Sequence, residues 1–359
     1  MTKRESIQIL CVLSVMALGL GLLTLRIVRA DDGDYYNFDY EDYWEEYRKL
    51  SYPEGTRLPC NGTSPSTCTW AWEPWYQHGT DVPRMQAEQY TGRTISGYAL
   101  MFQAYSSTDR NLHGGVFRRE SVEPCHTYRF SMGSRAGLEP SNPAPTDSRM
   151  RVGISPTGDY PDQIVLTDGD INAIKWSGAS NSKYAYEYLS VEATAESDTV
   201  TVYTRTDPDP NNQIYVFWDE GSFEEVPHTG DLVDVNGSLP SDMGPIDNVT
   251  VQQLGANSAT ITWNTGSIET LGQVLYRPLP EGTPPPGTYT YTVYLPLVAG
   301  QQTQSWSSSA VGDWNTNHAI VLTGLTSGMT YEYVVISYGD INNSCQTVAT
   351  DPAREFQTP

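Results

Sequence analysis

The sequence predicts an all-β protein in which two β-sandwich domains follow an N-terminal hydrophobic helix. Tyrosine, glycine and proline are abundant, with 24, 30 and 24 residues, and this composition favours strands that are joined by tight turns. Short runs of alternating apolar and polar residues recur between the turns, which is the period of a half-buried strand. The chain has 359 residues, which is enough for two domains of roughly 100–200 residues each.

Residues 1–30 are predicted to direct export. Lys3 and Arg4 precede an almost wholly apolar run from residue 7 to residue 25, and this order is typical of a signal peptide. The run is also close to the ~20 residues that span a bilayer, so an uncleaved signal-anchor is the alternative. Both interpretations predict an extracellular or cell-surface protein that is exported across the cytoplasmic membrane. If the N-terminal segment is uncleaved, it attaches the protein to the membrane.

Residues 31–50 are predicted to form an acidic, tyrosine-rich spacer. Residues 31–46 read DDGDYYNFDYEDYWEE and show no helical or strand period, as in a solvated segment. The alternative is a docking tail whose aromatic and acidic side chains meet a basic partner. The whole chain has a formal net charge of -22 and a pI of about 4.4. This charge disfavours nucleic-acid binding, because it repels phosphates.

Residues 51–240 are predicted to form a jelly-roll domain of two packed sheets. The region lacks helical periodicity and contains strand patterns at 98–103, 115–118, 127–131, 150–154, 185–193, 199–203 and 214–218.

Parts of this domain resemble bacterial carbohydrate-binding-module jelly rolls, also called galactose-binding-like domains. The run Val122-Glu-Pro-Cys-His-Thr-Tyr-Arg-Phe-Ser131 resembles a strand entry of that family, and Cys125 stands where the pattern usually has glycine. Residues 150–158 resemble another strand and its turn, and residues 216–219 resemble the last strand. The resemblance implies a polysaccharide or surface glycan as the binding partner.

Sugar recognition requires flat aromatic faces and a few polar side chains, and this domain has both. The ligand-binding candidates are Trp75, Tyr76, Tyr105, His113 and Trp176. Trp75, Tyr76 and Trp176 stand beside turn residues, where binding sites are common, so they are the best candidates for exposed rings. The alternative for each aromatic residue is packing in the core, and for His113 it is a turn built on the glycines that follow.

Tyr184, Tyr186 and Tyr188 are further aromatic residues of this domain. They would share one face of a strand, because side chains alternate along a strand. Packing on the sheet is again the alternative.

The run Asp168-Gly-Asp-Ile-Asn172 resembles the beginning of a calcium loop, with Asp168 and Asp170 as candidate metal ligands. It lacks the glutamate that such a loop carries at its twelfth position, and a turn is the simpler interpretation. A structural calcium ion is common in the jelly rolls that the domain resembles. It is the one cofactor that the resemblance implies.

Residues 245–359 are predicted to form an antiparallel sandwich. Its short strand patterns lie at 249–251, 259–263, 273–276, 288–297, 319–322, 331–337 and 355–358.

The run Gly328-Met-Thr-Tyr331-Glu-Tyr333 resembles the corner before strand F of fibronectin type III domains. The resemblance implies that the Tyr331 hydroxyl forms a hydrogen bond with the backbone upstream, and that Trp263 is the buried tryptophan of strand B. The proline-rich stretch 278–304 is longer than the usual connection. Domains of this family usually act as spacers or adhesive units.

The exported part contains Cys60, Cys68, Cys125 and Cys345, an even number that suits a disulfide-permitting compartment, whereas Cys11 lies in the apolar run. Cys60 and Cys68 flank a turn and are the first predicted pair. Cys125 and Cys345 would then join the two domains. Other connectivities remain open.

No G-x-S-x-G, H-E-x-x-H, P-loop or G-x-G-x-x-G motif stands in a fitting context. The sequence therefore predicts no catalytic residues and no enzyme, but a surface protein that binds glycans through the jelly roll, with the fibronectin-like domain as spacer. The alternative is a structural subunit of a surface filament, sheath or membrane-associated assembly that contacts neighbouring subunits. A hydrolase with an unrecognised site is the least supported alternative.

Overall fold

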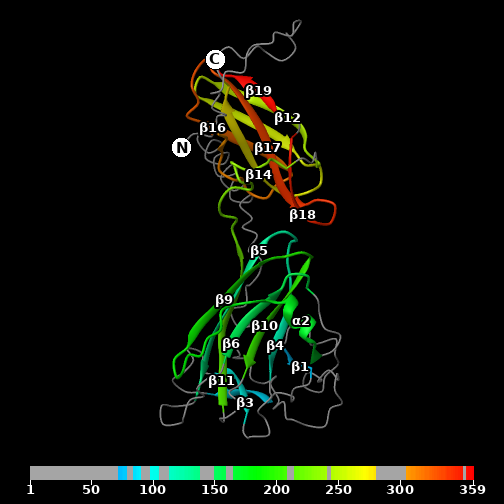
Figure 1. The fold of residues 1–359 in the computed structure, drawn as a ribbon, viewed down its shortest axis with the longest axis vertical. Coiled ribbons are helices and arrows are strands. Elements are labelled where there is room, and N and C mark those ends of the chain that lie inside the picture. The colour runs from blue at the N-terminus through cyan, green and yellow to red at the C-terminus, as the bar shows by residue number, and fades with distance from the viewer. Residues whose placement is uncertain are drawn as a thin grey trace, which may run out of the picture. The chain divides into compact units, whose positions relative to one another are not determined.

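The computed structural model confirms the all-β class. It describes residues 72–78, 84–89, 98–104, 113–137, 149–158, 165–207, 214–240, 244–279, 305–350 and 353–359. The chain divides into two compact units, of which the first ends at Val226 and the second begins at Pro227 (Figure 1). The predicted export segment and acidic spacer lie outside the described residues. Within the described part, no helix is long and apolar enough to cross a membrane.

The first unit contains two β-sheets whose inner faces share one core (Figure 1). The six-stranded sheet has the order β7 (Val165–Leu166), β1 (Glu73–Gln77), β4 (Gly114–Ser121), β10 (Thr199–Asp207), β6 (Arg149–Ser155) and β8 (Lys175–Trp176). The five-stranded sheet has the order β2 (Arg84–Gln89), β3 (Tyr98–Ala104), β11 (Ile214–Val226), β5 (Thr127–Ala136) and β9 (Glu187–Thr194). All of these pairings are antiparallel except that of β1 with β7.

Strand alternation divides each sheet into an inner and an outer face. On β10, Val200 and Val202 belong to the core between the sheets, whereas Tyr203 belongs to a separate cluster on the outer face. On β5, Phe130 and Met132 belong to the same inner core. Because successive side chains point to opposite faces, the residues that alternate with these core residues point to the outer faces of the sheets.

A short helix, α2 (Asp168–Ala173), lies where the sequence predicted a turn or a calcium loop. The Asp170 carboxylate accepts a hydrogen bond from the Thr167 backbone N–H at 2.7 Å, and the Thr167 hydroxyl accepts one from the Asp170 N–H at 3.3 Å. This capping box satisfies amides at the start of the helix. Ile171 is the buried residue of α2, so the helix has an apolar contact as well as a cap.

One tyrosine in each unit fixes a corner of the chain in the same way. The Glu123 N–H donates to the Tyr128 hydroxyl at 3.0 Å, and the Thr326 N–H donates to the Tyr331 hydroxyl at 2.8 Å. The hydrogen bond predicted for Tyr331 is therefore present. Cys125, inside the first corner, has a φ of 67°, a conformation that glycine adopts readily. This explains why glycine is usual at that position in the family pattern.

The second unit also contains two sheets. One has the order β12 (Asp247–Gly255), β13 (Ser258–Asn264) and β16 (Asn317–Thr323). The other has the order β15 (Ser307–Ser308), β14 (Thr270–Pro278), β17 (Thr330–Asp340) and β18 (Cys345–Ala349), and β19 (Arg354–Gln357) pairs with the first part of β17. The strand predicted at 288–297 lies outside the described residues. Trp263 and Tyr331 are buried in the core of this unit, and its membership of the fibronectin type III family stays a prediction.

Residues 227–240 pack with the second unit, although the sequence assigned them to the first domain. Gln273 of β14 donates to the Asp231 carboxylate at 2.6 Å and accepts from the Leu232 N–H at 2.9 Å. Apolar side chains of the segment contact the cluster of buried residues on β14, β17 and β18, and they are Leu232, Val233, Val235 and Leu239.

Cys125 and Cys345 are both disulfide-bonded, which confirms the prediction that these two cysteines form disulfides. Cys60 and Cys68 lie outside the described residues, and the predicted pairings stay predictions.

His318 is a buried titratable group of the second unit. Its ring stacks on Trp263 with the ring centroids 4.6 Å apart, and its Nε2 lies 2.9 Å from the Thr270 hydroxyl. Burial lowers the pKa of His318 from 6.5 to about 4. The folded unit therefore favours neutral histidine more strongly than the unfolded chain does. This stabilisation is present above pH 6.5 and is lost as the pH falls through the window from 6.5 to about 4.

We expect His318→Phe to reduce the loss of unfolding free energy between pH 6.5 and about 4, because phenylalanine keeps the aromatic contact but takes up no proton. Urea denaturation of the full chain at several pH values, followed by tryptophan fluorescence, measures this slope. His228→Phe is the matched control, because His228 is an exposed histidine of the same unit. Equal slopes for wild type and His318→Phe would contradict the assignment.

Candidate functional site

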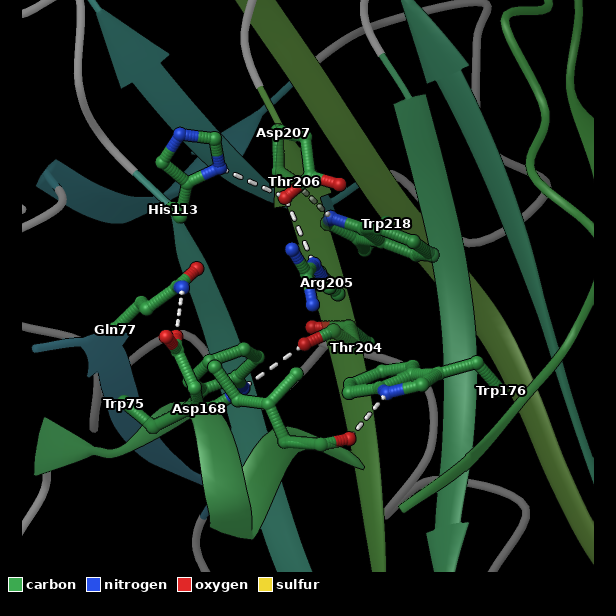
Figure 2. Close-up of polar contacts among 11 residues, drawn as sticks. Trp75, Gln77, His113, Asp168, Trp176, Thr204, Arg205, Thr206, Asp207 and Trp218 are labelled. Atoms are coloured by element: carbon green, nitrogen blue, oxygen red, sulfur yellow. Dashed lines mark hydrogen bonds and ion pairs between the residues drawn. The ribbon is translucent and has the colours of Figure 1, made fainter. Parts of the chain in front are cut away.

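The outer face of the six-stranded sheet brings several predicted site residues together (Figure 2). Trp75 of β1 and Trp176 of β8 lie there with their ring centroids 6.1 Å apart. Residues 165–176 pass over this face, and apolar side chains from them pack against the sheet. The resulting cluster is Trp75, Phe117, Leu166, Ile171, Ile174 and Tyr203, with Trp176 against it.

Trp75 and Tyr76, two of the three best candidates for exposed rings, are buried, and the alternative of packing in the core holds for both. Trp75 has 0% exposure and Tyr76 has 4%. The Trp75 indole N–H donates to the Thr204 carbonyl at 2.9 Å, so the ring has a hydrogen-bond acceptor beneath the apolar cover. A buried tryptophan with a satisfied N–H is a core residue, and we assign Trp75 no ligand.

Trp176 remains half-buried at the edge of this cluster. Its N–H donates to the Ile171 carbonyl at 2.9 Å, and the Arg205 guanidinium carbon lies 5.7 Å from its ring centroid. The ring lies over Gly153, where an added Cβ would come within 2.7 Å of ring carbon Cε3. Only glycine on this part of β6 leaves room for the indole.

His113, Arg205 and Asp207 form a group of polar contacts beside the tryptophans (Figure 2). Asp207 Oδ1 lies 2.9 Å from His113 Nδ1 and accepts a hydrogen bond from Arg205 Nε at 2.7 Å. Burial raises the pKa of Asp207, but the hydrogen bonds and charges of His113 and Arg205 outweigh it, so the pKa lies below its usual value. The carboxylate therefore stays ionised and holds both partners in place.

The calcium candidates have other partners. Asp168 accepts a hydrogen bond from Gln77 Nε2 at 2.7 Å, and Asp170 forms the capping box of α2. Among the residues that the structure describes, no group of three or more histidine, cysteine or acidic side chains could hold a metal ion. Tyr105, the remaining ligand candidate, lies outside the described residues.

The outer face of the five-stranded sheet carries an aromatic cluster that the sequence candidates did not include. Tyr188 of β9 is 58% exposed and pairs with Gly133 of β5. An added Cβ on Gly133 would lie 3.3 Å from a ring carbon of Tyr186 and 3.5 Å from one of Tyr188. Both rings therefore lean over this glycine, which lets them lie close to the backbone of β5.

Tyr186 lies between the exposed Tyr188 ring and buried residues of the same face. It packs against Met101 and Phe217, which are buried, and Tyr215 lies against the same pair. The guanidinium carbon of Arg135 lies 5.2 Å from the Tyr186 centroid and 4.9 Å from that of Phe217. This arrangement is favourable for the cation, because the ring faces carry partial negative charge.

Polar side chains border the aromatic cluster on the same face. The Ser131 hydroxyl donates to the Ser190 hydroxyl at 3.0 Å. One step further along β5, Arg129 forms ion pairs with Glu192 at 2.6 Å and with Glu224 at 2.9 Å. The face thus combines an exposed ring, hydroxyls and fixed charges within neighbouring rungs of β5 and β9.

The chain matches no protein-family model, and no curated protein matches it. Solved structures that it resembles include carbohydrate-binding modules. The CBM22-1–GH10 modules of a Clostridium thermocellum xylanase, complexed with xylohexaose, share 11% identity over 45% of this chain and 27% of that chain, with a TM-score of 0.27. TmCBM61 in complex with β-1,4-galactotriose shares 9% identity over 48% of this chain and 99% of that one, with a TM-score of 0.29. The CBM22 tandem of Paenibacillus barcinonensis Xyn10C shares 8% identity over 86% and 100%, with a TM-score of 0.28.

Trp75→Ala should lower the free energy of unfolding of the first unit by about 3–5 kcal/mol, because it leaves a cavity and removes a buried ring. Tyr188→Ala should lower it by less than about 1 kcal/mol, because most of that ring is already in water. Urea denaturation of the full chain measures both. Similar losses for the two variants would contradict the distinction between a covered face and an open one.

Proposed function

We propose that this chain is a non-catalytic extracellular or cell-surface protein that binds glycans on the outer face of the five-stranded sheet. The observation that carries the proposal is Tyr188, which is 58% exposed and rests over Gly133. The face of an exposed, supported ring suits the C–H groups of a pyranose, because burying apolar surface against it is favourable.

The surroundings of Tyr188 support a sugar as the ligand. Tyr186 is half-buried and leans over the same glycine. Tyr215 of β11 is half-buried against Met101 and Phe217, the residues on which Tyr186 packs, so the aromatic cluster extends over more than one strand. The paired Ser131 and Ser190 hydroxyls and the ion pairs of Arg129 provide polar groups that could exchange hydrogen bonds with sugar hydroxyls. A few oriented polar groups beside an apolar surface are typical of small-ligand sites.

The ionised state of Asp207, on the outer face of the six-stranded sheet, also agrees with a binding role. A general acid needs a carboxyl whose pKa is raised toward the working pH. The pKa of Asp207 is lowered instead, which suits a structural anion. In this proposal the second unit is a spacer, and the partner is a polysaccharide or surface glycan outside the cell.

Tyr188→Ala should weaken glycan binding by about tenfold or more, whereas Tyr188→Phe should keep most of it, because stacking needs the ring and not the hydroxyl. A glycan array with the full chain selects the ligand, and isothermal titration calorimetry measures the affinities. Xylohexaose and β-1,4-galactotriose, which occur in the solved structures named above, are the first probes.

Val321→Ala is the matched control, because Val321 is another exposed apolar residue, at 58%, but lies on β16 of the second unit. It should leave the affinity unchanged. Folded wild-type protein that binds no glycan, or a Tyr188→Ala variant that binds as wild type does, would refute the proposal.

A further inference from the structure

Arginines gather on the outer face of the six-stranded sheet, at the ends of β6 and β10. Arg151 stands directly opposite Arg205, and Arg149 stands opposite Asp207 on the next rung of the same face. Met150 and Val152 of β6 belong to the inner core, so the alternation of the strand places both Arg149 and Arg151 on the outer face.

The opposition of Arg151 and Arg205 places two cations next to each other, and an anion that contacts both would stabilise it. Side chains directly opposite each other begin about 4.5–5.5 Å apart at their Cβ atoms, and like charges there destabilise the sheet. Arg205 already shares Asp207 with His113. Arg151 is half-buried, and its side chain forms no hydrogen bond or ion pair with the rest of the described chain.

The acidic composition of the chain makes the lack of a carboxylate partner for the Arg151 side chain unexpected. The chain has 43 acidic residues and only 21 lysines and arginines, so carboxylates that could pair with an arginine are plentiful. Arg129 pairs with two of them on the other sheet. An arginine that stands opposite another arginine instead is suited to a carboxylate from outside the chain, because two parallel N–H groups of a guanidinium match its two oxygens.

The neighbours of the two arginines fit a sugar ring that carries the carboxylate. Trp176 is half-buried and lies beside the Arg205 guanidinium, so its indole offers apolar surface. Figure 2 shows Gln77, His113 and Asp207 around Arg205 on the same side of the sheet, where their polar atoms can meet hydroxyls.

We propose that Arg151 and Arg205 bind the carboxylate of a uronic acid unit in an acidic polysaccharide. The proposal rests on the proposed function only in taking the ligand to be a sugar chain. Arg151 and Tyr188 lie on different sheets, so the two sites can fail separately. The net charge of -22 does not prevent binding, because salt screens charges that lie more than about 8–10 Å away.

Isothermal titration calorimetry of the full chain with trigalacturonate, its methyl ester and neutral galactotriose tests the proposal. We expect trigalacturonate to bind at least about tenfold more tightly than its methyl ester or galactotriose. We expect Arg151→Gln to lower the affinity for trigalacturonate about tenfold. Arg151→Lys should lose part of it, because lysine keeps the charge without the fork. Circular dichroism and the melting temperature establish that each variant is folded.

Lys175→Gln is the matched control. Lys175 is an exposed cation on β8 next to Trp176, but it pairs with Ile154, whose side chain belongs to the inner core, so it lies on the opposite face. It should change the affinity for trigalacturonate less than about twofold. Tyr188→Ala should also leave this affinity unchanged, which separates the result from the test of the proposed function.

Several results would overturn the proposal. They are no binding of trigalacturonate by wild type, equal binding of the methyl ester, or equal losses for Arg151→Gln and Lys175→Gln. Tighter binding of a sulfated disaccharide than of trigalacturonate would overturn the assignment to a carboxylate. Tighter binding of a synthetic peptide of residues 31–46 would overturn the assignment to a sugar.

Discussion

The pleat of the strands in the first unit determines what each face of its sheets can do. Val200 and Val202 of β10 fill the core between the sheets, which forces Tyr203, Arg205 and Asp207 to the outside. Residues 165–176 cover part of the outer face of the six-stranded sheet and bury Trp75. On the five-stranded sheet, Tyr188 stays exposed. The difference between the two outer faces, more than the number of aromatic residues, separates structural rings from those available to a ligand.

Much of the fold could be predicted from the sequence, because it depends on local signals. Alternating apolar residues mark the strands, and the resemblance around Tyr331 to the corner before strand F of fibronectin type III domains implies a hydrogen bond that the structure contains. The corner at Tyr128 has the same form, and Cys125 with its positive φ shows why the pattern there usually has glycine. These features depend on contacts within a few residues.

The site was harder to predict, because exposure depends on residues far apart in the chain. Trp75 stands near turn residues, but its N–H bonds to Thr204, 129 residues away, and α2 covers its ring. The alternation of side chains along a strand predicts that Tyr186 and Tyr188 share a face, but only the pairing of β9 with Gly133 shows that their rings have space and support. The facing arginines likewise follow from the register of β6 with β10, which no local pattern contains.

Hydroxyl-radical footprinting of the full chain tests this account most directly, because it reports the exposure of individual side chains with and without a bound glycan. We expect Tyr188 to be oxidised rapidly and Trp75 hardly at all in the free protein. We further expect a glycan selected on the array to protect Tyr188 and to leave the second unit unaffected. Rapid oxidation of Trp75, or protection that spares Tyr188 when the glycan is bound, would contradict the assignment of the open face as the binding site.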